Sequence, residues 1–338
     1  MSETSADVAV IGGGISGIAC AGALAAHGLR VEVIDRGHAI GGRLATQTMR
    51  DTGMPCDGRV VDVGASYVTA DDPAFVAVVR DWVDRGVARE WTDTFHVADS
   101  AGLIGPKLGP IRYAAPAGMR TLVVDLASRL PEDLVRVTHP ADVERIEVTD
   151  SGVSLHGEGV DDAAYRAVAL CGPDPQMSSI APPGAVRDAL QSSPTWEPVM
   201  ALTAAYDERS WPDLDGVFVN DDAILTFVAD DGRRRGDDAP VLVAHSTPVL
   251  AAAHLRDPAA AAPAMLAALR HIVAGADPAW FTVKRWTYAR PTRSRDEDHV
   301  LDGPIGAAGD SWARGPRTQA AWVSGDSLGR ALATRLTS

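Results

Sequence analysis

The chain has 338 residues, a length that favours two domains over one. Hydrophobic residues make up 46% of it and charged residues 22%, a balance that is typical of folded globular proteins and excludes a disordered or fibrous chain. A formal net charge of −14 would repel phosphate backbones and anionic lipids, so we expect neither nucleic acid nor membrane as a partner.

The first elements along the chain predict a parallel βαβ unit. A short apolar strand covers residues 7–11, a helix covers residues 15–27 and is capped by Gly28, and a second strand covers residues 30–34. No basic or cleavable apolar segment precedes the first strand, so we expect no signal peptide. Cys20, Cys56 and Cys171 have no metal-ligand spacing, so we also expect no metal site and a reducing, cytoplasmic location.

The turn between the first strand and the helix predicts a phosphate site. Gly12, Gly14 and Gly17 fit the pattern G-x-G-x-x-G, in which a pyrophosphate lies against backbone amides at a helix N-terminus. Asp35 ends the second strand, where a carboxylate binds a ribose hydroxyl. These features leave NAD and FAD open as cofactors. The candidate cofactor contacts here are Gly12, Gly14, Ile15, Ser16, Gly17, Asp35 and Arg36.

A second glycine turn follows at Gly41-Gly42-Arg43. Gly42 offers another close backbone approach to phosphate, and the Arg43 guanidinium suits bidentate phosphate binding. The alternative is a surface turn with a solvated arginine.

The remaining elements alternate between helices and strands. We predict helices over residues 73–85, 118–130 and 258–274 and from about residue 319, and strands within residues 135–155 and over 165–171, 201–206, 216–228, 241–246, 280–288 and 305–308. The basic run Arg233 to Arg235 lies among aspartates and predicts a solvated loop.

Three side chains of the later strands are candidates for a substrate site. Trp286 and Tyr288 share one side of their strand, where they either wall a site or pack in the core. His245 ends an apolar strand and is either a core residue or a functional one. Arg290 and Arg293 follow and could meet a substrate phosphate.

These features together resemble the flavin amine oxidase superfamily and, within it, renalase. The resemblance rests on Gly41-Gly42-Arg43 after Asp35, on the stretch Asp62-Val63-Gly64-Ala65-Ser66-Tyr67, on Gly309-Asp310 before the last helix, and on His245 and Trp286. It implies an α/β fold of the p-hydroxybenzoate hydroxylase type. A Rossmann-type FAD-binding domain would comprise residues 1–70, 111–178 and 289–338, and an inserted antiparallel-sheet substrate domain residues 71–110 and 179–288.

The resemblance also implies roles for single residues. Gly309 and Asp310 would hold the pyrophosphate and ribityl chain, and a helix N-terminus near Trp322 and Val323 would direct amides at the flavin, where it stabilises negative charge. Further cofactor contacts would be Gly64, Ala65, Ser66 and Val143. The residues around the reacting ring would be His245, Trp286, Tyr288 and Tyr67.

By the same resemblance, the reaction is hydride transfer from 2- or 6-dihydro isomers of NAD(P)H to FAD. Oxygen would then take the electrons, giving NAD(P)+ and hydrogen peroxide. Residues 199–206 lack the lysine that several amine oxidases carry there, and the last third lacks a cysteine for a covalent link, so we expect non-covalent FAD. The alternatives are an oxidase or desaturase of an amine or apolar substrate, and a flavin-bound protein without turnover.

Overall fold

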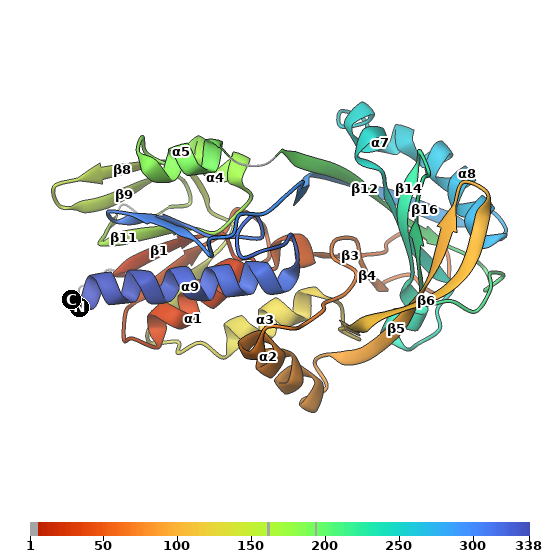
Figure 1. Cartoon of the computed structure of the whole chain (residues 1–338), viewed down its shortest axis with the longest axis horizontal. Helices are drawn as coiled ribbons and strands as arrows, with labels where there is room; N and C mark the ends of the chain where they lie inside the picture. The colour runs from red at the N-terminus through yellow and green to blue at the C-terminus, as the bar shows by residue number, and fades with distance from the viewer. Residues whose placement is uncertain (1–5, 161–162, 193–194) are drawn as a thin grey trace. The chain divides into compact units, whose positions relative to one another are not determined.

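The computed structural model describes residues 6–160, 163–192 and 195–338 (Figure 1). It divides into two compact units that each combine distant segments. The first unit comprises Met1–Gly42, Val123–Thr195 and Arg290–Ser338, and the second comprises Arg43–Leu122 and Trp196–Ala289. Residues 43–70 and 111–122 therefore pack with the second unit and residues 179–195 with the first, which differs from the bounds expected above. The assignment of cofactor and substrate roles to these segments stays a prediction.

The first unit is built on a mainly parallel sheet, and the predicted βαβ unit is confirmed. Strand β1 lies between β2 and β11 and pairs with both in parallel. Its four residues are all buried, as expected of a parallel strand covered on both faces. The order in the sheet is β17 (Val300–Asp302), β18 (Ile305–Ala307), β11 (Ala167–Leu170), β1 (Val8–Ile11), β2 (Val31–Ile34) and β7 (Val135–Thr138).

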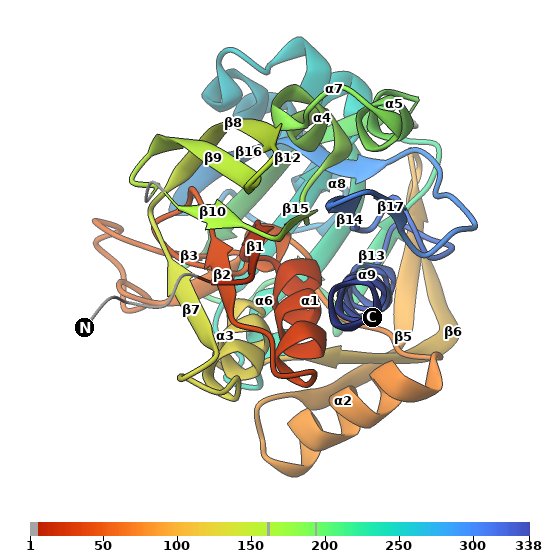
Figure 2. The same ribbon diagram turned by 90° about the vertical axis from the view of Figure 1, so that its left-hand side faces the viewer.

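Helices α1 (Ile15–Ala25) and α9 (Thr318–Thr337) lie side by side against this sheet (Figure 2). A Cβ at Gly325 would lie 2.0 Å from the carbonyl oxygen of Ser16, and one at Gly329 2.6 Å from that of Cys20. The two contacts are four residues apart on each helix and occur in the same order along both. The helices therefore run in the same direction. Glycine at both positions is what allows the backbones to approach so closely.

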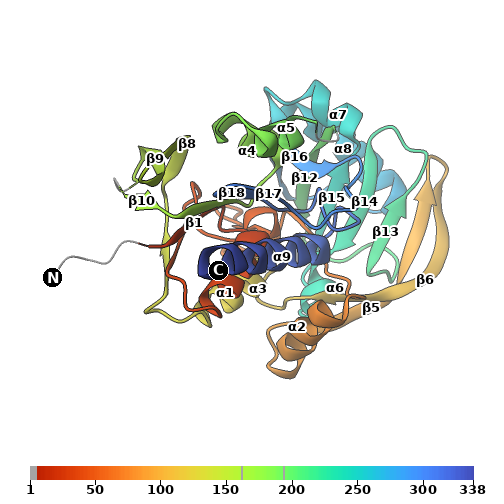
Figure 3. The same cartoon turned by 60° about the vertical axis from the view of Figure 1, so that its left-hand side comes forward.

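A smaller antiparallel sheet and three short helices complete the first unit (Figure 3). The sheet consists of β8 (Asp142–Thr149), β9 (Gly152–Glu158) and β10 (Ala164–Tyr165). The helices are α3 (Arg120–Ser128), whose first residues belong to the second unit, and α4 (Asp174–Ile180) and α5 (Ala185–Gln191). The sequence pattern did not predict α4 and α5.

The second unit is built on a mainly antiparallel sheet. Its strand order is β16 (Trp280–Pro291), β12 (Trp196–Ala205), β15 (Val241–Ser246), β14 (Leu225–Asp230), β13 (Gly216–Val219), β5 (Arg89–Asp99) and β6 (Gly102–Ala114). One face packs on α8 (Ala262–Val273) through a core that includes Leu202, Ala244, Val228 and Met265. Because side chains alternate along strands, Phe218, Phe227 and His245 lie on the opposite face.

Short elements surround the sheet of the second unit. They are η1 (Gly42–Leu44), β3 (Thr46–Thr48), β4 (Val60–Asp62), α2 (Pro73–Asp84), α6 (Asp231–Arg235), α7 (Pro248–Ala253) and η2 (Pro258–Ala261). Asp72 caps α2, since its carboxylate accepts from the amides of Ala74 and Phe75. In the described part of the chain, no helix combines the length and the apolar character needed to cross a membrane.

The prediction of a solvated loop at Arg233 to Arg235 is wrong. These residues form the end of α6, where Arg234 is fully buried and Arg235 is 9% exposed. Burial is possible because both guanidinium groups pair with Asp231 and lie near Asp62.

Candidate functional site

The glycine turn before α1 leaves room for a ligand at one glycine only. Gly12 has φ +112°, and its Cβ would lie 2.4 Å from the carbonyl oxygen of Cys171. A Cβ at Gly17 would lie 1.9 Å from the carbonyl oxygen of Gly12. Both glycines are thus explained by packing within the protein. A Cβ at Gly14, by contrast, would have no neighbour closer than Gly42 Cα at 4.0 Å, so the protein itself leaves this space open.

Two polar side chains beside this space fit a bound dinucleotide. Ser16 lies in the first turn of α1 and is 5% exposed, yet its Oγ has no hydrogen-bond partner among the described residues. A buried hydroxyl without a partner is unfavourable, and a pyrophosphate oxygen would satisfy it. Asp35 directly follows β2 and accepts from the amides of Gly13 at 2.6 Å and Gly37 at 2.7 Å. This fixes its carboxylate beside the turn, while Arg36 is exposed.

The second glycine turn touches the first. The Gly41 amide donates to the Gly13 carbonyl at 2.8 Å, and a Cβ at Gly42, which has φ +53°, would lie 3.4 Å from Gly14 Cα. Val143 is buried on β8, and the neighbouring Ala141 amide donates to the Asp35 carbonyl at 2.9 Å. These segments therefore gather at the carboxyl ends of β1 and β2, where dinucleotides bind in doubly wound sheets.

A third segment of the first unit carries Gly309 and Asp310. The Gly309 amide donates to Ser324 Oγ on α9 at 2.9 Å, and Asp310 is 8% exposed. The next residue, Ser311, donates to the buried carboxylate of Asp174 at 2.7 Å, and Arg295 donates to the same carboxylate at 2.8 Å. This network fixes the turn after β18.

Helix α9 begins earlier than the resemblance implies. Its first residue is Thr318, so its first-turn amides precede Trp322 and Val323, which lie in the second turn. Gly325 of α9 lies beside Ser16 of α1. From this contact back to its first residue, α9 is about six residues, or about 9 Å, longer than α1. Two positive helix ends therefore face the same way within the first unit.

The segment after β4 contributes further predicted contacts in the second unit. A Cβ at Gly64 would lie 2.0 Å from the Arg43 carbonyl oxygen, which also accepts from the Ala65 amide at 2.9 Å. Ser66 is 5% exposed, and its Oγ has no partner in the described structure. The Arg43 guanidinium donates to the Ala289 carbonyl at 3.1 Å and lies over the Trp196 ring at 5.1 Å.

A buried network of ion pairs lies next to the segment after β4. Asp62 accepts from the Met119 amide at 2.7 Å and lies within ion-pair distance of Arg234 and Arg235, as does Asp231. Burial raises the pKa of Asp62 above its usual value, against the two arginines. Burial also opposes ionisation of Asp231, but Arg234, Arg235 and Arg59 outweigh it and hold the pKa of Asp231 low.

Aromatic rings line the face of the second unit's sheet that lies opposite α8. His245 and Phe227 are 5.9 Å apart between ring centroids, and Tyr67 packs on Phe95 at 5.5 Å. We call this set the ring cluster; its members are Tyr67, Trp91, Phe95, Phe218, Phe227 and His245. The structure thus brings the predicted residues Tyr67 and His245 together. Sequence analysis missed four members, since β5, which carries Trp91 and Phe95, was not predicted, and residues 216–228, which carry Phe218 and Phe227, were predicted as one strand without a site residue.

Trp286 and Tyr288 lie apart from the ring cluster. Both are part-buried on β16, two strands from the strand of His245, and within the described residues neither makes a ring contact with the cluster. The Trp286 indole N–H donates to the Val63 carbonyl at 2.6 Å. The Trp286 side chain packs near Ala201 and Val241. Its contact is therefore with the segment that carries Gly64 and Ser66.

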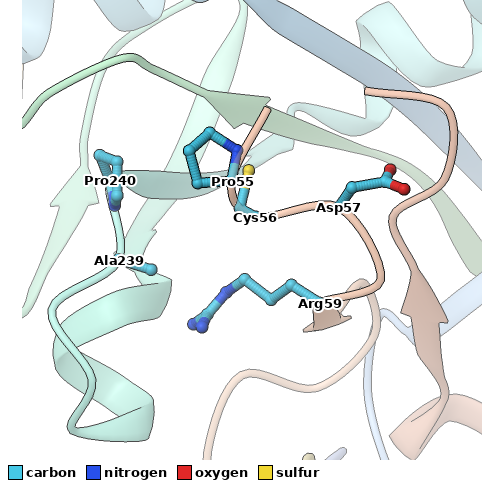
Figure 4. A pocket seen from close by; sticks show the side chains of 6 residues that line it. All are labelled: Pro55, Cys56, Asp57, Arg59, Ala239 and Pro240. Atoms are coloured by element: carbon cyan, nitrogen blue, oxygen red, sulfur yellow. The ribbon is translucent and has the colours of Figure 1, made fainter. Parts of the chain in front are cut away.

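A pocket of about 430 Å³ lies elsewhere in the second unit (Figure 4). Its lining residues are Pro55, Cys56, Asp57, Arg59, Ala239 and Pro240. The Arg59 guanidinium points along it but is paired with Asp231 at 2.8 Å and with Asp237. Its charge is thus already neutralised, and the predicted site residues do not line this pocket. In the described part of the chain, no group of three His, Cys, Asp or Glu side chains is placed to hold a metal.

Comparison with known proteins identifies relatives of the whole chain. The family model for flavin-containing amine oxidoreductases matches residues 88–325, and that for an NAD(P)-binding Rossmann-like domain matches residues 10–82. Three solved structures illustrate the shared fold. A protein described as a protoporphyrinogen oxidase from an Exiguobacterium species is 14% identical, with a TM-score of 0.75 and coverage of 99% of this chain and 100% of the other.

Two amine oxidases resemble the chain to the same degree. Putrescine oxidase with bound putrescine is 17% identical, with a TM-score of 0.74 and coverage of 98% and 99% of the two chains. Cyclohexylamine oxidase from Brevibacterium oxydans is 16% identical, with a TM-score of 0.75 and coverage of 99% and 100%. At these identities the likeness confirms the predicted fold class.

Proposed function

Because this chain belongs to the family of flavin-containing amine oxidoreductases, it is a flavin-dependent oxidoreductase, and we propose that it oxidises 2- or 6-dihydro isomers of NAD(P)H. The cofactor of the proposal is FAD, bound without a covalent link. The products are NAD(P)+ and, with oxygen as acceptor, hydrogen peroxide.

The observation that carries a bound dinucleotide is the open space at Gly14, and the family match favours FAD as that dinucleotide. A dinucleotide pyrophosphate fits there against the N-terminus of α1, with Ser16 Oγ as an additional donor. Asp35 would bind the adenosine ribose. The three cysteines of the chain all precede residue 172, so the last third offers no thiol for a flavin link.

The substrate side of the proposal rests on the ring cluster. The flavin, when bound, accepts a hydride and passes the electrons to oxygen. A dihydropyridine releases hydride to recover aromaticity, so the protein has to align the ring rather than supply a base. Rings such as Phe218 and Tyr67, which are exposed and part-buried respectively, offer flat apolar surface for such alignment. Strand β12 carries no lysine, in keeping with chemistry that needs no base there.

The test is anaerobic mixing of the purified protein with candidate donors while flavin absorbance is followed. We expect rapid reduction by the 2- or 6-dihydro isomer. Ordinary 4-dihydro NADH should react about a hundredfold more slowly, because a misplacement of about 1 Å has that effect on rate. Failure of every donor to reduce the flavin would favour a flavin-bound protein without turnover.

A variant of Trp286 tests the proposed site further. Trp286→Ala removes the hydrogen bond to Val63 and the packing beside it, so we expect about tenfold slower reduction with FAD still bound. Phe281→Ala, on the same strand but half-exposed, serves as the control and should reduce at the normal rate. Unchanged reduction in Trp286→Ala would remove this residue from the site.

A second candidate function is oxidation of an amine. It is favoured by the family match over residues 88–325 and by the likeness to putrescine oxidase and cyclohexylamine oxidase. The same assay decides between the two. Faster flavin reduction by benzylamine or putrescine than by either dihydronicotinamide isomer would establish the amine oxidase and refute the first proposal.

A further inference from the structure

We infer that the ring cluster binds a substrate that combines a planar ring with an anionic oxygen group, a carboxylate or a phosphate, and that Arg112 receives that group. The inference deepens the proposed function and rests on it only in taking this face as the substrate side. Arg112 lies on β6 and is 5% exposed. Its guanidinium carbon lies 3.9 Å from the centre of the Phe95 ring, 5.6 Å from that of Tyr67 and 5.7 Å from that of Phe218.

Arg112 is a buried cation without a carboxylate. Among the residues that the structure describes, no acid lies within ion-pair distance of it. The other buried arginines of the second unit, Arg234 and Arg235, both pair with Asp231. Aromatic faces attract a cation, but they do not replace the hydration that a buried guanidinium loses. Arg112 therefore lacks the carboxylate partner that Arg234 and Arg235 have.

The guanidinium also has donors to spare. Of its five N–H groups, one meets the Pro110 carbonyl at 3.3 Å. Its Nε has no acceptor in the described structure. A planar fork of free N–H groups is the geometry that binds carboxylate and phosphate oxygens in pairs.

The surroundings favour a ligand in which a planar ring accompanies that anion. The rings of Phe95 and Phe227 are buried, whereas Phe218 is 36% exposed and Tyr67 is part-buried, so these last two rings make the cluster reachable from outside the sheet. Lys107 lies directly opposite Phe95 across the ladder of β5 and β6, which places a second cation on the same face. In a chain with a net charge of −14, two cations on an aromatic face favour an anionic ligand and repel a cationic amine.

The test measures binding of matched probes to the flavin-loaded protein by titration calorimetry. Phenylacetate and phenylacetamide have the same shape and differ in charge, and phenethylamine carries the opposite charge. We expect phenylacetate to bind at least tenfold more tightly than phenylacetamide, and phenethylamine to bind most weakly. Phenyl phosphate is the second anion, and the tighter of the two names the anionic group. Equal affinity of the anions and the amide, or tightest binding of the amine, would overturn the inference.

Variants locate the effect. Arg112→Gln should reduce phenylacetate affinity to that of the amide while leaving phenylacetamide unchanged, and Arg112→Lys should retain part of the difference. Arg270→Gln, at an exposed arginine of α8, is the matched control and should change nothing. Undiminished phenylacetate binding by Arg112→Gln would also refute the inference. If Arg112→Gln does not fold, the probe series on the unmodified protein decides alone. Binding is read without reduction of the flavin, so this outcome is independent of whether dihydronicotinamides are the donors.

Discussion

Gly14→Val should weaken FAD binding severely while leaving the fold intact. The residue has φ −80° and ψ 179°, a conformation open to any side chain, and its Cβ would meet no protein atom closer than 4.0 Å. In the free protein, the change at this helix N-cap should alter the free energy of unfolding by about 1 kcal/mol or less.

In the complex, the added side chain takes the place of the pyrophosphate. Displacement of the phosphates would break about two charge-assisted hydrogen bonds of about 1.5–3 kcal/mol each. The sum of about 3–6 kcal/mol corresponds to an increase in the Kd of roughly a hundredfold to ten-thousandfold. Gly14→Ala, which adds one methyl group, should show a smaller increase.

Gly17→Ala is the matched contrast. Its Cβ would lie 1.9 Å from the Gly12 carbonyl oxygen, so the helix has to move, and the unfolding free energy should fall by about 3 kcal/mol. The assays are the flavin content of the purified variants, fluorescence titration of the apoproteins with FAD, and urea unfolding of the apoproteins. Full flavin occupancy in Gly14→Val, or equal destabilisation by the Gly14 and Gly17 changes, would refute the steric reasoning.

Two further predictions concern the buried charges and thiols. Asp231→Asn leaves buried arginines without a partner and should lower the unfolding free energy by about 3–5 kcal/mol, whereas Asp213→Asn, at an exposed ion pair, should cost less than about 1 kcal/mol in urea titrations. Because the pKa of Asp231 is lowered in the folded protein, its contribution is complete above about pH 4 and is lost below; a constant difference from the Asn variant down to pH 2 would contradict this. With Ellman's reagent, the native protein should expose a single reactive thiol, Cys56, since the other two cysteines are buried. Burial raises the pKa of Cys56, so its rate should still increase beyond pH 9, and a plateau by pH 8 would speak against it.

The parts of the fold that the sequence predicted depend on local patterns. The unit over residues 8–34 combines two short apolar runs, a helical period and glycines at fixed spacing, and each of these can be recognised within a few residues. The hairpin of β5 and β6 could not be recognised in this way. Strand β6 contains Gly105, Pro106, Gly109 and Pro110, residues that disfavour strands, and it is extended because it pairs with β5 along its length.

The residues of the candidate site also fall into those that a local pattern predicts and those that only the folded chain brings together. Gly14 and Asp35 follow from a local motif, and the structure places both at one end of β1 and β2. The burial of Arg234 could not be predicted, because its neighbour Asp62 lies far away in sequence. The ring cluster was missed for a similar reason, since its rings come from separate strands whose register only the folded sheet defines. Arg112 has no distinguishing feature in the sequence.

The contact of α9 with α1 has a consequence for the order of events during synthesis. Gly325 and Gly329 of α9 pack closely against α1, the first helix of the chain, and β18 pairs with β11 in the sheet of the first unit. A nascent chain that has emerged only as far as β11 has therefore made the glycine turn and α1, but not the helix and strand that pack on α1 and β11. The proposed FAD site should therefore acquire its ligand only after α9 has left the ribosome. Until then, the uncovered side of α1 is an apolar surface on which chaperones can act.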